Sequence, residues 1–199
     1  MSRKRQVSRV ISWQQTLVGG ALDISPKKKL RKLNYLFFHL RECFSVTHLL
    51  RIYTVLYEST LTYGIIHWGA SAHTRTLIVL QKAVLKCIMR LPKMTPTSSV
   101  LDKTRKMSLN QLYKYRVLMF TFKHLKLFGQ DPGVERSTRI GTRASDQRFL
   151  KHPNWTKYHS RNQVCYQGCE LFNELPKNLR QEKKIGVFKR GLRALLNEG

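Results

Sequence analysis

Acidic residues are scarce in this sequence of 199 residues. Eleven Asp and Glu stand against 37 Lys and Arg, which gives a formal net charge of +26 at pH 7. The four aspartates are isolated from one another, at Asp23, Asp102, Asp131 and Asp146. Two-metal phosphoryl transfer needs clustered carboxylates that hold the cations. The sequence therefore argues against a carboxylate-based polymerase or nuclease centre.

Long apolar runs are also missing. No run approaches the roughly 20 residues that a membrane-spanning helix needs. The N-terminal stretch MSRKRQVSRVISWQQ has basic residues but no apolar segment after them, so it does not resemble a secretory signal. We therefore expect an intracellular protein, nuclear or cytoplasmic, that does not span a membrane.

Cysteine is sparse, with four residues in the whole chain, Cys43, Cys87, Cys165 and Cys169. Without an export signal they are expected to be thiols in a reducing compartment. A zinc site needs four nitrogen or sulfur ligands, usually in close pairs. His152, His159, Cys165 and Cys169 have imperfect spacing for such a site. We expect no metal there, and two buried or partly exposed thiols instead. No Gly-rich phosphate loop is present either.

What the chain does contain is enough apolar surface to fold and a large excess of basic groups. Apolar residues make up 42% of the sequence, which is typical of a folded protein. A charge of +26 causes self-repulsion in the compact state unless a polyanion relieves it. Nucleic acid is the favoured polyanion, because binding of its phosphates releases counterions. A membrane surface is the rival partner, but we expect no membrane partner, because the wide apolar stripes described next suit helices that pack on one another in a bundle.

Apolar spacing predicts a mainly α-helical fold. A first helix is expected over residues 26–43, because Leu30, Leu33, Phe37 and Leu40 recur at steps of three or four residues. Residues 45–69 predict one long helix with an unbroken apolar stripe. Gly64 lies inside that stripe, where a closely crossing neighbour helix would explain the missing side chain.

Further helices are expected over residues 74–90 and 108–128, near residues 99–106 and 169–175, and over 185–196. One or two short strands are expected within residues 148–168. The predicted organisation is a basic leader (1–24), a helical bundle (25–128), a linker (129–145) and a basic C-terminal region (146–199) with short strands and a terminal helix.

The candidate nucleic-acid contacts are basic side chains away from the apolar faces, and one tryptophan that could stack on bases. They are Lys27, Lys28, Arg31, Lys32, Arg75, Lys82, Lys86, Arg90, Trp155, Lys189, Arg190 and Arg193. Three of them, Lys82, Lys86 and Arg90, are spaced four apart. They should line up on one helix, where a bound anion would relieve their repulsion.

Five segments together resemble a known family. LLRIYTVLYESTLTYGIIHWGAS followed by LQKAVLKCIMRLP resembles the region after the catalytic palm of non-LTR (LINE-type, jockey-like) retrotransposon reverse transcriptases. KKKLRKLNYLFFHLREC, LNQLYKYRVLMFTFKH and YQGCELFNELPKNLRQ with FKRGLRALL agree in the same order. The resemblance covers about residues 27–197. The residues that carry its motifs are Tyr63, Gly64, Trp68, Gly69, Leu80, Gln81, Tyr166, Gly168, Phe172, Asn173 and Pro176.

By this resemblance, residues 27–128 would be the thumb-like region, which grips the template–primer duplex beside the palm. The motif residues would have packing and backbone-positioning roles. The family implies RNA-directed DNA synthesis with magnesium, but the palm with its Ala-Asp-Asp motif has no counterpart here. We therefore expect a chain that is not itself an enzyme and needs no cofactor, and that binds RNA, DNA or hybrid duplex nonspecifically. Magnesium would belong only to the full-length parent enzyme.

Three alternatives stay open at this point. The chain could be a co-opted interaction module, in which a protein covers the apolar surface that the palm would otherwise cover. It could be a membrane-surface protein with basic amphipathic helices, although wide apolar stripes suit a bundle better. It could also be a non-functional relic of a retroelement.

Overall fold

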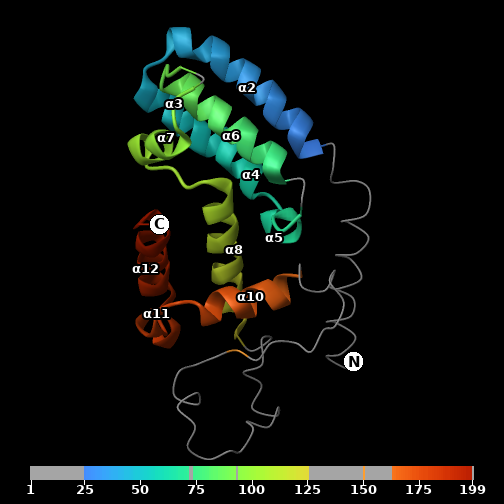
Figure 1. Cartoon of the computed structure of the whole chain (residues 1–199), viewed down its shortest axis with the longest axis vertical. Coiled ribbons are helices and arrows are strands. Elements are labelled where there is room, and N and C mark those ends of the chain that lie inside the picture. Colours follow the sequence, from blue (N-terminus) through green and yellow to red (C-terminus); the bar gives the residue numbers. More distant parts are fainter. Residues whose placement is uncertain (1–24, 72–73, 93, 126–149, 151–162, 199) are drawn as a thin grey trace, which may run out of the picture. The chain divides into compact units, whose positions relative to one another are not determined.

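The structure, a computed structural model, describes residues 25–71, 74–92, 94–125, 150 and 163–198. These residues are mainly α-helical, as the sequence predicts, and none of them forms a strand (Figure 1). The chain divides into two compact units, Met1–Asn110 and Gln111–Gly199. The predicted leader (1–24) and linker (129–145) lie outside the described residues. The predicted bundle (25–128) extends past the boundary between the two units, which follows Asn110.

Helix α2 (Ser25–Cys43) confirms the first predicted helix. Leu30 and Phe37 are fully buried, whereas Leu33 and Leu40 are half-buried. The helix packs against α6 (Thr74–Ile88), as Figure 1 shows. The Asn34 side-chain amide donates a hydrogen bond to the Leu80 carbonyl at 3.2 Å. These contacts fix which face of α2 points away from the core.

The long helix predicted over residues 45–69 is continuous from Val46 to Thr62 and is wrong beyond that point, because the chain turns at Gly64; the segment has four helical pieces. They are α3 (Val46–Ile52), the π-helix η1 (Tyr53–Glu58), α4 (Ser59–Thr62) and α5 (Ile65–Trp68). The buried side chains recur every fourth residue, at Leu49, Tyr53, Tyr57 and Leu61. In an α-helix each such step overshoots a full turn by about 40°. The wider turn of the π-helix offsets this drift and keeps the stripe on the core.

Gly64 breaks the segment between α4 and α5. Its φ of 64° is left-handed, and the preceding Tyr63 is extended. A Cβ placed on Gly64 would meet only the Trp68 ring, at an ordinary 3.7 Å. The expected close crossing by a neighbour helix is therefore wrong. The glycine is needed because residues that carry a side chain rarely adopt this backbone conformation.

Helix α6 confirms the third predicted helix but ends two residues early. Its most buried side chains include Leu77, Val84 and Ile88, as expected, whereas Leu80 and Leu91 of the predicted stripe are half-buried. After Ile88 the chain closes with a Schellman arrangement. The Leu91 amide donates to the Lys86 carbonyl at 2.9 Å, and the Arg90 amide donates to the Cys87 carbonyl at 3.1 Å. Arg90 has a φ of 54° at the position that glycine usually occupies.

Helix α7 (Thr97–Thr104) confirms the short helix expected near residues 99–106. It closes in the same way as α6, with Arg105 at a φ of 51°. The Lys106 amide donates to the Leu101 carbonyl at 3.3 Å, and the Arg105 amide to the Asp102 carbonyl at 3.2 Å. Two helices of the first unit thus place an arginine where the backbone favours glycine.

Replacing Arg105 by glycine should therefore stabilise the protein, by up to about 1 kcal/mol, because glycine adopts the left-handed conformation without a Cβ clash. The Arg105 side chain is exposed. Urea unfolding followed by circular dichroism measures the change. The matched control is Lys103→Gly, which places glycine at an exposed, helical position and should destabilise by roughly 1 kcal/mol. A lower midpoint for Arg105→Gly would contradict the argument.

The second unit is built from four helices among its described residues. They are most of α8 (Leu109–Lys123), α10 (Val164–Asn173), α11 (Lys177–Gln181) and α12 (Ile185–Glu198). Phe172 and Phe188 are fully buried, and the Phe122 ring stacks on Phe188 with centroids 4.1 Å apart. The Gln111 side-chain amide donates to the Leu196 carbonyl at 2.6 Å, which ties α8 to α12.

The structure corrects two predictions for the second unit. Residues 164–168 lie in α10, so the strand prediction is wrong there, and residues 148–149 and 151–162 of the same stretch lie outside the described part. The short turn expected near residues 169–175 is the second half of the same helix. Helix α8 buries residues around more of its circumference than predicted, including Tyr115 and Leu118, while His124 of the predicted face is exposed. None of the described helices could cross a membrane.

Candidate nucleic-acid interface

The basic residues of α2 lie on its outer side. Lys28, Arg31 and Lys32 are exposed, and Lys27 is half-buried at the start of the helix. Within the part of the chain that the structure describes, none of the three exposed side chains forms an ion pair. The three side chains are exposed to solvent in this structure.

Sequence reasoning missed the aromatic side chains on the same helix. Tyr35 is 68% exposed and Phe38 is 51% exposed. The His39 ring contacts both, with its centroid 4.4 Å from that of Tyr35 and 5.7 Å from that of Phe38. The Arg41 guanidinium lies over the Phe38 ring, 4.2 Å from its centroid. The sequence did contain a signal for this exposure. At about 100° per residue, Tyr35 and Phe38 fall on a different side of the helix from the buried Leu30 and Phe37.

The predicted basic row on α6 is only partly present. Lys82 and Lys86 lie on the helix and are half-buried, and Arg75 is exposed near its start. Arg90 lies beyond the last residue of the helix, and its left-handed backbone turns it away from the helical spacing. The expectation that Arg90 extends the row is therefore wrong.

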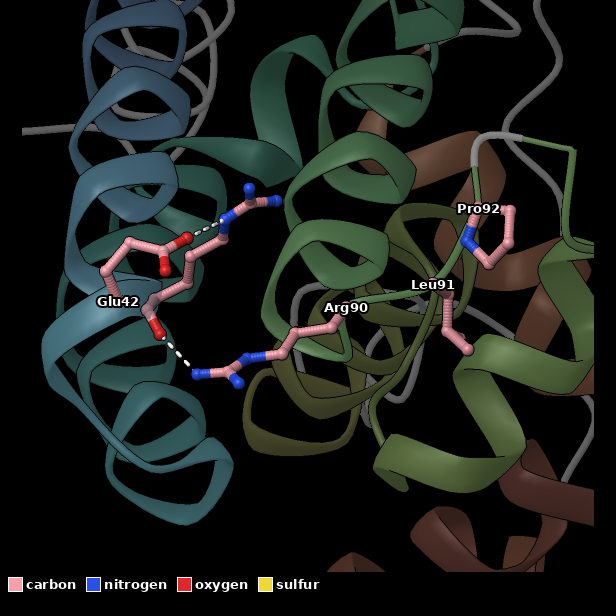
Figure 2. A pocket seen from close by; sticks show the side chains of 5 residues that line it. Glu42, Arg90, Leu91 and Pro92 are labelled. Carbon is pink, nitrogen blue, oxygen red and sulfur yellow. Dashed lines mark hydrogen bonds and ion pairs between the residues drawn. The ribbon is translucent and has the colours of Figure 1, made fainter.

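Arg90 instead reaches the C-terminal end of α2, as Figure 2 shows. Its Nη2 atom donates a hydrogen bond to the Arg41 carbonyl at 2.7 Å. Beside it, the Nε atom of Arg41 forms an ion pair with Glu42 at 2.9 Å. These residues line a hollow with Leu91 and Pro92. A cation at a helix C-terminus is favourable, so Arg90 has a structural task that sequence spacing does not reveal.

The basic residues of α12 form a second group, in the second unit. Lys189, Arg190 and Arg193 are exposed, while Phe188 on the opposite side of the helix is fully buried. The Arg193 guanidinium lies over the Tyr115 ring, 5.5 Å from its centroid. Trp155, the predicted stacking residue, lies outside the described residues.

The Tyr63-Gly64 and Trp68-Gly69 motif is a turn stabilised by the tryptophan. The Trp68 Nε1 atom donates a hydrogen bond to the Tyr63 carbonyl at 3.1 Å, across the left-handed Gly64. Trp68 is 8% exposed, whereas the Tyr63 ring is 84% exposed. Gly69 ends α5, and its amide donates to the Ile65 carbonyl. The motif therefore has a local structural reason in this chain.

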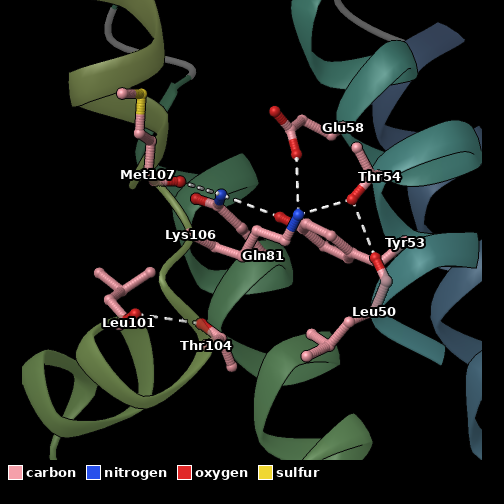
Figure 3. A network of polar contacts seen from close by, with 9 residues as sticks. All are labelled: Leu50, Tyr53, Thr54, Glu58, Gln81, Leu101, Thr104, Lys106 and Met107. Carbon is pink, nitrogen blue, oxygen red and sulfur yellow. Dashed lines mark hydrogen bonds and ion pairs between the residues drawn. The ribbon is translucent and has the colours of Figure 1, made fainter. Parts of the chain in front are cut away.

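Gln81, next to Leu80, joins three segments of the first unit (Figure 3). Its side chain is 2% exposed. The Nε2 atom donates to the Tyr53 hydroxyl and to the Met107 carbonyl, each at 3.0 Å. The Oε1 atom accepts a hydrogen bond from the Leu109 amide at 2.9 Å. Because the first amides of a helix have no partner within it, Gln81 caps the start of α8.

Lys106 closes the outer side of this network (Figure 3). Its Nζ atom donates to the Thr54 hydroxyl at 2.6 Å and lies 3.8 Å from the Glu58 carboxylate. Burial raises the pKa of Tyr53 far above its ordinary value, with the Gln81 hydrogen bond acting in the opposite direction. Burial also raises the pKa of Tyr57, which stacks on Tyr53 with centroids 5.2 Å apart. Both phenols are therefore neutral core groups.

The C-terminal motif residues organise α10 and the start of α11. Phe172 and Gly168 are buried, Tyr166 is half-buried, and Pro176 directly precedes α11. Asn173 pairs with both backbone groups of Leu150. Its Nδ2 atom donates to the Leu150 carbonyl at 2.9 Å, and its Oδ1 atom accepts from the Leu150 amide at 2.8 Å.

The cysteines of α10 are two thiols one turn apart. Cys169 is buried and Cys165 is half-buried, as the sequence predicts. Burial raises the pKa of both, that of Cys169 to about 11, and the neighbouring Cys165 adds to this rise. His152 and His159 lie outside the described residues. Within the described part of the chain, no group of three His, Cys, Asp or Glu side chains could hold a metal ion.

Comparisons of the chain with protein-family models, curated proteins and solved structures gave no match. What the chain does must therefore be argued from its own side chains. Among the described residues, the basic side chains singled out from the sequence on α2 and α12 are mostly exposed, and α8 carries further exposed basic residues. In the part of the chain that the structure describes, the basic residues of α2 have exposed aromatic rings on the same helix, Tyr35 and Phe38.

Proposed function

We propose that this chain binds nucleic acid without catalysis, through the exposed basic side chains of α2 and α12. The observation that carries the proposal is the charge of +26 on a chain whose core is largely apolar, and whose basic side chains, among the described residues and apart from the buried Arg180, lie exposed or half-buried. Self-repulsion of this size is relieved by a polyanion, and phosphates are the partners that basic helices attract.

We also propose that the chain is a fragment of a non-LTR retrotransposon reverse transcriptase, with residues 27–128 as its thumb-like part. The order of the five resembling segments supports this origin. The left-handed Gly64 and the buried Gln81 give two motif residues structural reasons to be retained. In this proposal the motif residues maintain the fold, the basic residues contact phosphates, and polymerisation would require the missing palm.

The test is binding of the purified chain to an RNA–DNA hybrid duplex across a salt series. Roughly five phosphate contacts should give a slope of log K against log salt of about −4.5. Circular dichroism shows whether the protein is folded under each condition. A slope near zero with a folded, helical protein would rule the proposal out.

The position of the binding surface is tested with matched charge-removing variants. Replacing Lys28, Arg31 and Lys32 by alanine should make the slope shallower by about 2.7 if each contacts a phosphate. A control with the same change in net charge replaces three exposed basic residues of α8, Lys114, Arg116 and Lys123. Equal losses in the two variants would mean that net charge alone, and not the outer side of α2, governs binding.

A second candidate function, docking of a protein partner, is favoured by exposed apolar side chains in the first unit. Val55 is 68% exposed, Leu56 is 41% exposed and Val79 is 60% exposed. In the proposed origin, such residues would face the missing palm. If the purified chain stays monodisperse and binds no apolar dye, this candidate loses its support.

A further inference from the structure

We infer that the outer face of α2 is a stacking platform for a single-stranded segment of RNA or DNA. Tyr35 and Phe38 supply the rings, and Lys28, Arg31 and Lys32 contact the phosphates. The inference rests on the proposed function, and it specifies both the form of nucleic acid and the residues that bind it.

The five side chains share one side of the helix. Successive residues of an α-helix are rotated by about 100°, which places all five within about a third of its circumference. The opposite side carries the fully buried Leu30 and Phe37 and packs against α6. The platform residues cannot therefore turn inward without unpacking the helix.

The two rings are held in place without being part of the core. Tyr35 and Phe38 keep 68% and 51% of their surface exposed. His39 makes a T-shaped contact with each ring, and Arg41 covers part of Phe38 at 4.2 Å from the ring centroid. An exposed row of π-systems with a guanidinium among them is the surface on which unpaired bases stack.

The charge of the same helix is complementary to a phosphate backbone. Residues 26–41 contain no Asp or Glu, and the exposed Lys28, Arg31 and Lys32 form no ion pair among the described residues. From Lys28 to Phe38 the helix rises by roughly 15 Å, which gives room for a few nucleotides of an extended strand.

Aromatic stacking is what distinguishes a single strand from a duplex at this surface. In a duplex the faces of the bases are covered by their neighbours, so Tyr35 and Phe38 cannot reach them. The phosphates are accessible in both forms. The rings should therefore contribute to binding of a single strand and contribute nothing to binding of a duplex.

The experiment measures binding of a labelled oligouridylate and of a blunt RNA–DNA hybrid to the full chain. Replacing Tyr35 and Phe38 together by alanine should weaken oligouridylate binding by roughly 25-fold or more and leave hybrid binding unchanged. The salt slope for oligouridylate should stay the same in this variant. It should become shallower by about 2 when Lys28, Arg31 and Lys32 are replaced by alanine.

Three controls separate stacking from other causes. Exchange of the two rings, Tyr35→Phe with Phe38→Tyr, should bind oligouridylate like the unchanged protein. The pair Tyr35→Leu and Phe38→Leu keeps apolar surface without rings and should bind as weakly as the alanine pair. Tyr63→Ala removes an exposed ring outside α2 and should have no effect.

Each outcome decides between the two proposals. If the folded, unchanged protein binds neither ligand, the proposed function fails and this inference fails with it. If it binds both, but the alanine pair binds oligouridylate normally, only the platform is overturned. Normal binding by the leucine pair would also overturn it, because an apolar contact would then replace stacking.

Discussion

Replacing Gln81 by leucine is expected to lower the free energy of unfolding of the first unit by roughly 3 kcal/mol or more. Leucine fills a similar volume, so a cavity is not the cause. The loss arises because the Leu109 amide, the Met107 carbonyl and the Tyr53 hydroxyl each lose their bond to Gln81. A buried polar group without a partner costs roughly 1–3 kcal/mol, and the replaced side chain is 2% exposed.

Urea unfolding followed by Trp68 fluorescence measures this loss. Trp13→Phe and Trp155→Phe remove the other two tryptophans of the chain, so that the signal reports on the first unit. Val79→Ala, an exposed change on the same helix as Gln81, should stay within about 0.5 kcal/mol of the parent. A Gln81→Leu midpoint equal to that of Val79→Ala would show that the three bonds contribute no net stability.

The network around Gln81 illustrates what the sequence could not predict. Periodicity predicted the existence of the main helices, because the spacing of Leu30 and Phe37 is a local property of the chain. The partners of Gln81 lie 26 to 28 residues away, so its role follows only from tertiary packing. The helical position of Gln81, in step with the buried Leu77 and Ile88, indicates burial, but a single helix does not reveal which groups its amide would bind.

Backbone conformation was the second source of error. The apolar stripe continues across Gly64, so periodicity predicted a helix where the chain turns. At the end of α6, Arg90 adopts a left-handed conformation without the glycine that usually signals it. The exposure of Lys28, Arg31 and Lys32 was predictable, because charged groups avoid an apolar core. The exposed Tyr35 and Phe38 were overlooked because aromatic residues are more often buried.

Alkaline pH is expected to unfold the first unit, because it contains two buried phenols. Tyr53 is 1% exposed and Tyr57 is fully buried, and burial raises the pKa of both above the ordinary value. The folded state thus keeps protons that the unfolded state releases above about pH 10. Their stabilising contribution is complete below that pH and is lost as the pH rises. The loss is on the order of 5 kcal/mol by about pH 12, similar to the whole stability of a small domain.

Circular dichroism and phenolate absorbance, recorded together during an alkaline titration, test this expectation, because unfolding and phenol ionisation should coincide. The net charge of the chain also falls at high pH, which reduces self-repulsion and opposes unfolding. The test therefore compares two variants in which this fall in net charge is nearly the same. Tyr57→Phe removes one buried phenol and should move the midpoint to higher pH, whereas Tyr63→Phe removes an exposed hydroxyl and should not. Coincident midpoints for these two variants would mean that another group causes the alkaline transition.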